Sequence, residues 1–330
     1  MTINCLLEVK QAGELFDGYA LIKSATEATA NNGSPYFTVV IGKKDKTMNC
    51  KLWERHFNGY TVSQLKSEIF KAGSILHVEG AITEYRGELQ MTIVNYRPIQ
   101  PGETDLDDFV EVAPEPIDQL QAEFEQFLDE IKSPVLKMIC QELYHDHMPS
   151  FLAFPAGKTN HHSFKGGLLY HVTSMLRIAK HICSQYKQIN RDLVYAGIAL
   201  HDLGKVVELS GYIAPDYTKV GNFLGHITIV NMFIDRKVQK LKEEKDKWTR
   251  ADFDLVYELM HIISAHHGKL EYGSPVVPKT LEAEVVHQID MLDSRINMIV
   301  SGLADDSLKS DEPKKIYPIG MFYKSSSQSE

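Results

Sequence analysis

The chain has 330 residues, enough for two domains, and its 43% hydrophobic and 24% charged residues are typical of a globular protein with a sizeable core. No stretch approaches the ~20 continuous apolar residues of a membrane span, the N-terminus lacks a signal pattern, and the four cysteines form no CxxC pair. The composition argues against a membrane protein, a zinc ribbon and a disulfide framework, and predicts a cytoplasmic location.

The formal net charge of -9 is unevenly distributed along the chain. Residues 1–98 hold 11 basic and 10 acidic residues, a net of +1, and residues 119–330 hold 24 basic and 27 acidic residues, a net of -3. Residues 99–118, between them, hold seven acidic residues and no basic one. Because neither flanking region is strongly charged, the charge neither demands nor excludes a nucleic-acid partner.

The N-terminal region, residues 1–98, is predicted to be all-β. Alternating patterns predict a first hairpin with strands at 36–42 and 46–54 and a second hairpin with strands at 74–85 and 88–96. Helical spacing predicts a helix between them at 61–73. The first hairpin turns at 43–45. In its second strand Met48, Cys50 and Leu52 alternate with polar residues and Trp53, so one face is buried. Five strands with one helix between the third and fourth predict an OB-fold barrel.

The region after the barrel is predicted to be a linker followed by an all-α domain. Residues 99–118 contain three prolines and little periodicity, as expected of an extended linker. The domain at 119–306 has helical patterns at 117–132, 134–146, 167–186, 192–203, 223–243, 252–267 and 281–304. The tail at 307–330 is polar, and we expect its last part to be disordered.

Imidazole and carboxylate side chains gather near the ends and edges of these helices. They are His171, His201, Asp202, His226, His266, His267 and Asp290. The last helix has an apolar stripe of Ile289, Leu292, Ile296, Ile299 and Leu303, with Asp290 at its edge facing a cleft. Each residue alone is explained as a satisfied core histidine or a helix-end acid. Together, six or seven nitrogen and oxygen ligands without cysteine suit hard divalent metal ions.

The segment IALHDLGKVVE, residues 198–208, places His201 and Asp202 just before Gly204 and Lys205. One interpretation is structural: Gly204 is a left-handed helix cap, and Lys205 complements the negative end of the helix dipole. The other is catalytic, with the Lys205 ammonium close to a phosphate or to its leaving oxygen.

The order His171, then His201-Asp202, then Asp290 resembles the H…HD…D signature of the HD phosphohydrolase superfamily. The segments NHHSFKGGLLYH, HDLGK and SAHHGKLEYGSP are similar to those of the YhaM family of 3′-to-5′ exoribonucleases, which join an OB-fold to an HD domain. The resemblance implies metal-dependent hydrolysis of single-stranded RNA to 5′-mononucleotides, and it favours Asp290 over Asp293 as the last ligand. It also implies Mn²⁺, whereas the ligand set alone admits Mg²⁺, Co²⁺ or Fe²⁺ too.

Phosphodiester hydrolysis requires neutralised phosphoryl oxygens and an activated water, which two metal ions roughly 3.5–4 Å apart supply. Asp202 is the expected bridge between the ions. One ion would be held by His171, His201 and Asp290, and the other by His226, His266 and His267. Asp202 and Lys205 are the expected catalytic residues.

The barrel is expected to bind single-stranded RNA, and also single-stranded DNA, by stacking and phosphate contacts. Lys51, Trp53 and Arg86 are the candidates, and Phe37 or Tyr36 would add a second platform. Alternation alone leaves open which of those two rings faces outward. Trp53 could instead pack on the neighbouring domain.

Two other functions are compatible with parts of the sequence. One is a phosphodiesterase or phosphohydrolase of small nucleotides, but a small substrate does not require a strand-binding module. The other is a non-enzymatic single-stranded DNA-binding factor, but a structural metal site is usually closed by four ligands. We expect no membrane partner, and a homo-oligomer is compatible with the sequence.

Overall fold

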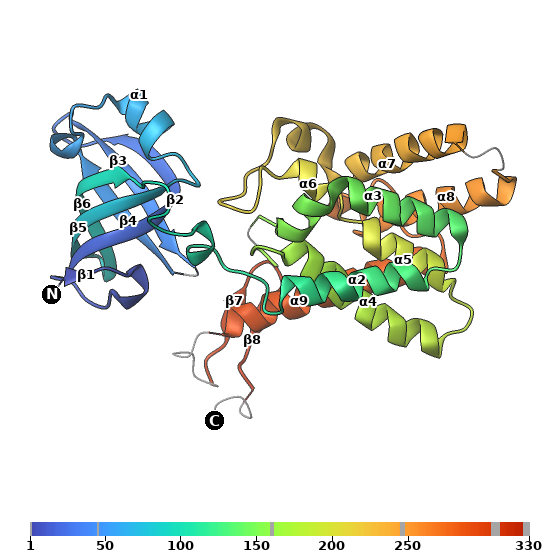
Figure 1. The fold of residues 1–330 in the computed structure, drawn as a ribbon. Coiled ribbons are helices and arrows are strands. Elements are labelled where there is room, and N and C mark those ends of the chain that lie inside the picture. The colour runs from blue at the N-terminus through green and yellow to red at the C-terminus, as the bar shows by residue number, and fades with distance from the viewer. Residues whose placement is uncertain (1, 45, 159–161, 245–247, 305–310, 326–330) are drawn as a thin grey trace. The chain divides into compact units, whose positions relative to one another are not determined.

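The computed structural model describes residues 2–44, 46–158, 162–244, 248–304 and 311–325. The chain divides into two compact units, residues 1–112 and 113–330 (Figure 1). The division falls inside the acidic segment 99–118. The first part of that segment folds onto the first unit, where Phe109 is buried and its carbonyl accepts a hydrogen bond from the Lys44 N–H over 2.8 Å. Ala113 belongs to the core of the second unit.

The first unit is a closed β-barrel. Its strands are β1 (Thr2–Ile3), β2 (Leu15–Thr29), β3 (Pro35–Lys43), β4 (Lys46–Trp53), β5 (Ile75–Tyr85) and β6 (Glu88–Pro98). The sheet order is β1-β2-β3-β4-β6-β5, and β5 pairs back with β2, which closes the barrel. Helix α1 (Val62–Gln64) and a π-helical turn (Leu65–Ile69) lie between β4 and β5. Five long strands with a helix after the third confirm the predicted OB-fold.

The second unit is a bundle of helices. Their bounds are α2 (Ile117–Glu130), α3 (Pro134–Ala153), α4 (Gly167–Gln185), α5 (Arg191–Leu200), α6 (Lys205–Glu208), α7 (Lys219–Glu244), α8 (Arg250–Ala265) and α9 (Leu281–Leu303). A short 3₁₀ turn occurs in this unit at Leu270–Tyr272, and the first unit has three, at Leu6–Glu8, Glu54–His56 and Leu106–Asp108. Helix α7 is kinked at Gly225, where φ is 68°. In the described ranges, every helix is too short or too polar to cross a bilayer.

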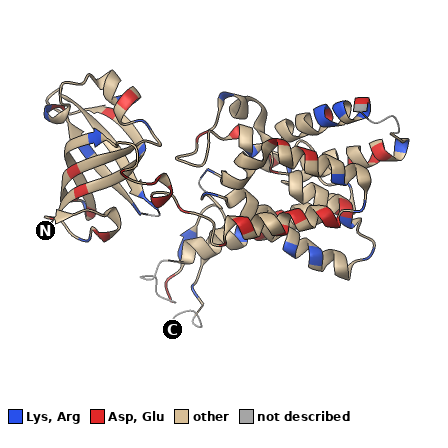
Figure 2. Cartoon of the chain, in the orientation of Figure 1, with Lys and Arg blue, Asp and Glu red and all other residues tan. Residues whose placement is uncertain are grey.

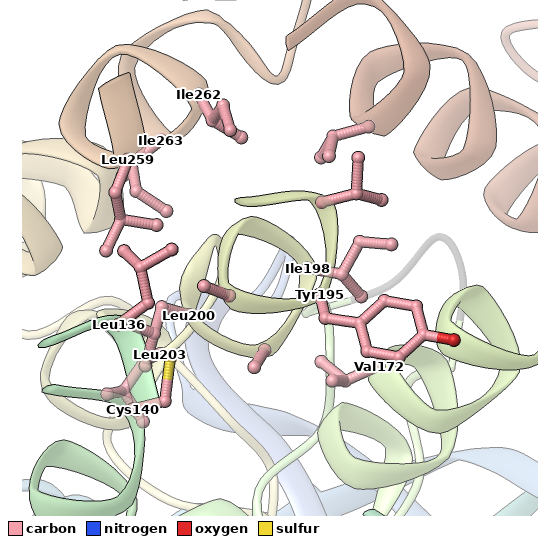
Figure 3. Close-up of a cluster of buried hydrophobic side chains, with 14 of the residues drawn as sticks. Leu136, Cys140, Val172, Tyr195, Ile198, Leu200, Leu203, Leu259, Ile262 and Ile263 are labelled. Atoms are coloured by element: carbon pink, nitrogen blue, oxygen red, sulfur yellow. The ribbon is translucent and has the colours of Figure 1, made fainter. Parts of the chain in front are cut away.

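Helix α5 lies at the centre of the second unit. All of its residues from Leu193 to Leu200 are buried, as expected of a helix that is apolar all round. Gly197 lets α8 approach closely, since a Cβ there would lie 2.6 Å from Cγ2 of Ile262. Figure 3 shows the resulting core, with Leu136, Cys140, Val172, Tyr195, Ile198, Leu259, Ile262 and Ile263 among its side chains. The end of α5 therefore carries His201 and Asp202 into the interior.

Helices α2 and α4 are joined by charged side chains. Helix α2 carries five acidic residues and no basic one, and its neighbour α4 carries the facing bases (Figure 2). The Arg177 guanidinium donates hydrogen bonds of 2.6–2.9 Å to Glu115 and Glu123, and Lys180 pairs with Glu130 at 2.9 Å. Two of the five acidic side chains of α2, Glu123 and Glu130, are thus paired with bases of α4.

The inner face of α9 differs from the predicted stripe. Ile289 is buried, but Leu292 and Ile296 are 48% and 50% exposed. The buried face instead includes His287 and Asp293. The predicted stripe is wrong there because the inner face of α9 is partly polar, so the apolar residues do not mark it.

The segment expected to be a polar tail contains a small hairpin. Strands β7 (Lys314–Ile316) and β8 (Gly320–Phe322) pair in antiparallel fashion within the second unit. The second unit is therefore helical with one added hairpin. The last residues of the chain, 326–330, lie outside the described residues.

Candidate metal centre and strand-binding face

Asp202 lies at the centre of the cluster of candidate ligands. It follows His201, the C-terminal capping residue of α5, and is 2% exposed. Its Oδ2 lies 3.3 Å from Nε2 of His201 and 3.8 Å from Nε2 of His171. Its Oδ1 lies 3.4 Å from Nε2 of His226 and 3.9 Å from Nε2 of His266. The two carboxylate oxygens therefore face two different sets of imidazoles.

The remaining candidates complete the two sides of this cluster. Oδ1 of Asp290 lies 3.3 Å from Nε2 of His171, next to Oδ2 of Asp202. On the other side, the ligand atoms of His226, His266 and His267 lie within 4.8 Å of one another. His266 also groups with His201 and Asp290 at that limit, so the sides adjoin. All seven residues named from the sequence are brought together.

Hydrogen bonds at Nδ1 set the orientation of each imidazole. In three of them Nδ1 faces a backbone carbonyl: that of Ile198 for His201 (2.9 Å), that of Ile263 for His266 (2.7 Å) and that of Tyr272 for His267 (2.9 Å). In the other two Nδ1 faces a carboxylate: Glu208 for His226 (3.1 Å) and Asp293 for His171 (2.7 Å). A carbonyl only accepts, so the Nδ1 that faces one carries the proton. Nε2 is then left as an electron-pair donor, the arrangement found in metal-ligating histidines.

Several buried polar atoms of the cluster have no hydrogen-bond partner among the described residues. They are Nε2 of His201, His226 and His266, and Oδ1 of Asp202. Burying such atoms without a partner is unfavourable by a few kcal/mol each, roughly 1–3. Bound cations would satisfy these atoms. The donor set of imidazole nitrogens and carboxylate oxygens therefore fits divalent metal ions.

The protonation equilibria of the cluster reflect its mixed charges. Burial opposes ionisation of Asp202, but Lys205 and His201 outweigh it and hold the pKa of Asp202 well below its usual range. Burial, together with neighbouring imidazoles, lowers the pKa of His266 well below its usual value and so keeps that ring neutral. Burial lowers the pKa of His171 as well, but hydrogen bonds to Asp290 and Asp293 outweigh it and raise that pKa to about 9. The ionised carboxylates of Asp202, Asp290 and Asp293 thus favour positively charged partners in this cluster.

Lys205 binds Asp202 rather than the end of α5. Its Nζ donates to Oδ2 of Asp202 over 2.7 Å and to the carbonyl of Ala156. Gly204 is right-handed, with a φ of -62°, so the prediction of a left-handed cap was wrong. Glycine is required there because a Cβ would lie 2.3 Å from the carbonyl oxygen of His226. This close approach brings α7 and its histidine up to Asp202.

Two carboxylates, Asp293 and Glu208, support histidines of the site and were not identified in that role from the sequence. Asp293 accepts hydrogen bonds from Nδ1 of His171, from Nε2 of His162 at 2.8 Å and from Ser174. Glu208 accepts from both the N–H and Nδ1 of His226. Asp290 therefore faces Nε2 of His171 in the cluster, whereas Asp293 accepts a hydrogen bond from Nδ1 on the opposite side of that ring. The three-residue spacing of the two aspartates indicates a shared helix face but not this division.

An open pocket of about 590 Å³ adjoins the cluster. Asp202, Lys205, His267 and Asp290 line one part of it. The rest is lined by side chains of α9, by Tyr272 of the 3₁₀ turn and by the tip of the C-terminal hairpin. The cluster is therefore accessible to a substrate through Asp202, His267 and Asp290, although most of its ligands are buried.

The barrel carries a second hollow of about 790 Å³. Tyr36, Lys51, Trp53 and Tyr85 line it. The rings of Tyr36 and Trp53 are 4.9 Å apart and tilted by 34°, and Nζ of Lys51 lies 4.9 Å from the Tyr36 ring. Arg86 lies in the adjacent β5–β6 turn, with its guanidinium 5.2 Å from the ring of Tyr85. Two aromatic rings and a cation thus share one exposed face.

Phe37 is not part of this face, and its assignment as a strand-binding residue was wrong. It is fully buried in the barrel core, opposite Leu52, whereas Tyr36 is opposite Trp53. The predicted loop at 43–45 would pair residues 42 and 46. The structure pairs Lys43 with Lys46, which shifts the register by one residue. Such a shift reverses the face of every side chain on the strand. Tyr85 was missed because it ends its strand, where alternation is weak.

Comparison with known proteins found a matching family model, a similar protein and a similar solved structure. Residues 168–295 match the model of the HD domain family. The chain is 39% identical over 290 residues to the 3′-5′ exoribonuclease YhaM of Bacillus subtilis (strain 168), covering 88% of each chain. A structural match covers 32% of this chain and 100% of the second OB-fold domain of replication protein A from Methanococcus maripaludis, with 16% identity and a TM-score of 0.21.

Proposed function

Because the chain belongs to the YhaM family of 3′-5′ exoribonucleases, we propose that it hydrolyses single-stranded RNA from the 3′ end to 5′-mononucleotides, with divalent metal ions at the histidine–aspartate cluster. One observation carries this proposal. The two oxygens of Asp202 face different sets of imidazole nitrogens, at 3.3–3.9 Å. A carboxylate in that position suits two ions that act on one phosphodiester.

The seven candidate ligands divide between the two ions. His171, His201, Asp290 and Oδ2 of Asp202 would hold one, and His226, His266, His267 and Oδ1 of Asp202 the other. When bound, the ions supply charge neutralisation at the phosphoryl oxygens and a nucleophile derived from water near neutral pH. Mn²⁺ is the ion we propose, and the nitrogen and oxygen ligands also suit Mg²⁺, Co²⁺ and Fe²⁺.

The protein side chains orient the reactants and balance charge. Fixed Nδ1 hydrogen bonds keep the imidazoles directed at the cluster, so that little reorganisation accompanies binding. Asp202 is the shared carboxylate of the site. The Lys205 ammonium beside it is the donor that would stabilise the negative charge on a phosphoryl or leaving oxygen.

The hollow of the barrel is the proposed binding face for the strand. Bases would stack on Trp53 and Tyr36, and Lys51 and Arg86 would contact phosphates. Stacking of this kind is tolerant of base identity, as a nuclease that removes successive nucleotides requires. This face also favours a strand over the small-nucleotide substrates that an isolated HD domain would accept.

Further expectations belong to the same proposal. Single-stranded DNA is proposed as a second substrate, since stacking and phosphate contacts do not require a 2′-hydroxyl. Self-association and a cytoplasmic location stay predictions from the sequence. The four cysteines are all free, in keeping with a reducing compartment.

The test is incubation of the purified chain with 5′-labelled RNA or DNA, with and without Mn²⁺. We expect the labelled RNA to shorten progressively from its 3′ end only when the ion is present, and to pause where a stable duplex begins. The matched control is Asp202→Asn, which keeps the size of the side chain but removes its charge. Cleavage of a circular single strand would contradict exonuclease action, and undiminished cleavage by the variant would contradict the metal site.

A further inference from the structure

The C-terminal hairpin is anchored on α9 by a specific apolar contact. Ile316 of β7 is buried, whereas Tyr317 and Met321 of the same hairpin are 80% and 56% exposed. A Cβ on Gly302 would lie 2.8 Å from Cδ1 of Ile316, so the missing side chain at 302 creates the space that Ile316 fills. This contact fixes the position of the hairpin relative to the helix.

The tip of the hairpin lies at the pocket of the metal centre. Pro318 and Ile319 line the same 590 Å³ pocket as Asp202 and Asp290. Met291 and Met298 of α9 line it too, and Tyr272, Ser294 and Arg295 add polar groups to its wall. The pocket thus combines a charged part, where the ions would bind, with an apolar part. Its volume is within the roughly 300–1,000 Å³ typical of small-molecule sites.

An enzyme that releases mononucleotides needs room for one nucleoside beyond the bond that it cleaves. The scissile phosphate must be at the ions, so the terminal nucleoside must occupy the space next to them. Methionine, proline and isoleucine offer apolar surface without fixed hydrogen-bond donors or acceptors, and methionine adapts to differently shaped partners. Such a wall would hold any base and would distinguish none of them strongly.

Given the proposed exonuclease function, on which this step depends, we infer that Ile319 and Pro318 of the hairpin tip, together with Met291 and Met298, bind the base of the 3′-terminal nucleotide. Ile319 is then a positioning residue. It sets the terminal nucleotide against the metal centre but does not contact the reacting atoms.

A double-mutant-type cycle tests this inference by removing either the Ile319 side chain of the protein or the terminal base of the RNA. The wild type and Ile319→Ala are compared on an ordinary RNA and on an RNA whose last nucleotide carries no base. On ordinary RNA we expect Ile319→Ala to raise KM roughly tenfold, the discrimination given by a small change in an apolar pocket, with little change in kcat. On the baseless RNA the two proteins should have the same KM, because the partner of Ile319 is absent.

Matched variants separate this effect from damage to the hairpin. Met321→Ala changes a residue of the same hairpin that is 56% exposed and should leave both substrates unaffected. Met298 is on α9, so Met298→Ala should also raise KM on ordinary RNA only, even if the hairpin variant folds poorly. Ile319→Leu keeps an apolar side chain of the same size and should have the wild-type KM.

The possible outcomes are distinct. Equal loss on both RNAs, or no loss on either, for both Ile319→Ala and Met298→Ala would overturn the inference while leaving the exonuclease assignment intact. If the wild type shortened neither RNA in Mn²⁺, the proposed function would fall, and this inference with it.

Discussion

Nδ1 of His171 and Oδ2 of Asp293 lie 2.7 Å apart, and this hydrogen bond connects a candidate metal ligand on α4 to a carboxylate on α9. Asp293 also accepts a hydrogen bond from His162. The carboxylate therefore fixes the ring of His171 and directs its Nε2 at Asp290 and Asp202. A group of this kind strengthens metal binding without itself touching the ion.

The first prediction concerns this carboxylate. Asp293→Ala should weaken Mn²⁺ binding by about 10- to 100-fold, the usual effect of removing a carboxylate behind a histidine ligand. Isothermal titration of the metal-free protein measures the affinity directly. Asp235→Ala, on the exposed side of α7, is the control and should bind Mn²⁺ normally. An unchanged affinity in Asp293→Ala would show that Asp293 does not support the site.

The second prediction concerns the buried pair of Asp202 and Lys205. Lys205 is 9% exposed and depends on Asp202 for its charged hydrogen bond. In metal-free protein, Asp202→Ala should lower the free energy of unfolding by about 3–5 kcal/mol, because it leaves a buried charge uncompensated. Asp202→Ala combined with Lys205→Met should recover most of that loss. Urea unfolding of the wild type, of the single variants Asp202→Ala and Lys205→Met and of the double variant measures the coupling, and simple additivity would contradict it.

The third prediction separates the two faces of the barrel. Trp53→Ala should weaken binding of single-stranded RNA by about 1–3 kcal/mol, the worth of one stacked base, and leave stability largely unchanged. Phe37→Ala should instead lower the free energy of unfolding by about 3–5 kcal/mol, since it empties a buried site. Fluorescence anisotropy and urea unfolding give the two quantities.

The control for this pair is Tyr60→Ala, which removes an aromatic ring that is 39% exposed in the same unit. It should alter neither quantity much. If Trp53→Ala reduced stability as strongly as Phe37→Ala does, Trp53 would be a packing residue and the strand would bind elsewhere.

The fourth prediction is a pH dependence of stability from Arg177. Its hydrogen bonds lower the pKa of Glu115 from the ordinary 4.5, so this carboxylate stabilises the fold above that pH. The contribution is lost as pH falls through the lower pKa of the folded state. Because the groups are partly exposed, Arg177→Met should cost only about 1 kcal/mol at pH 7. The difference from wild type should shrink in acid.

Thermal unfolding at pH 7 and at pH 3 tests the sign of this effect. Lys187→Met removes a positive charge from an exposed position after α4 and serves as the control. A wild-type advantage over Arg177→Met that grew in acid would contradict the role of the Glu115 carboxylate.

Local patterns in the sequence determined the barrel, the helices and the residues that gather at the cluster. Alternation over 46–54 predicted which face of β4 is buried, because the side-chain direction of a strand depends only on neighbouring residues. Period-3.6 patterns likewise located α4, α5 and α8. The H…HD…D spacing identified His171, His201, Asp202 and Asp290 before any distance between them was known.

Strand register and contacts between distant segments decided the rest. The pairing of Lys43 with Lys46 placed Tyr36 rather than Phe37 on the strand-binding face. Asp290 and Asp293 share one face of α9, and only the position of His171, more than a hundred residues earlier, gives them different roles. The hairpin at 314–322 has strands too short to show a pattern, and Ile316 of β7 packs against Gly302 of α9. Periodicity in the sequence indicates which face of a helix or strand a residue occupies. Which residue of another segment it contacts depends on the packing of the whole unit.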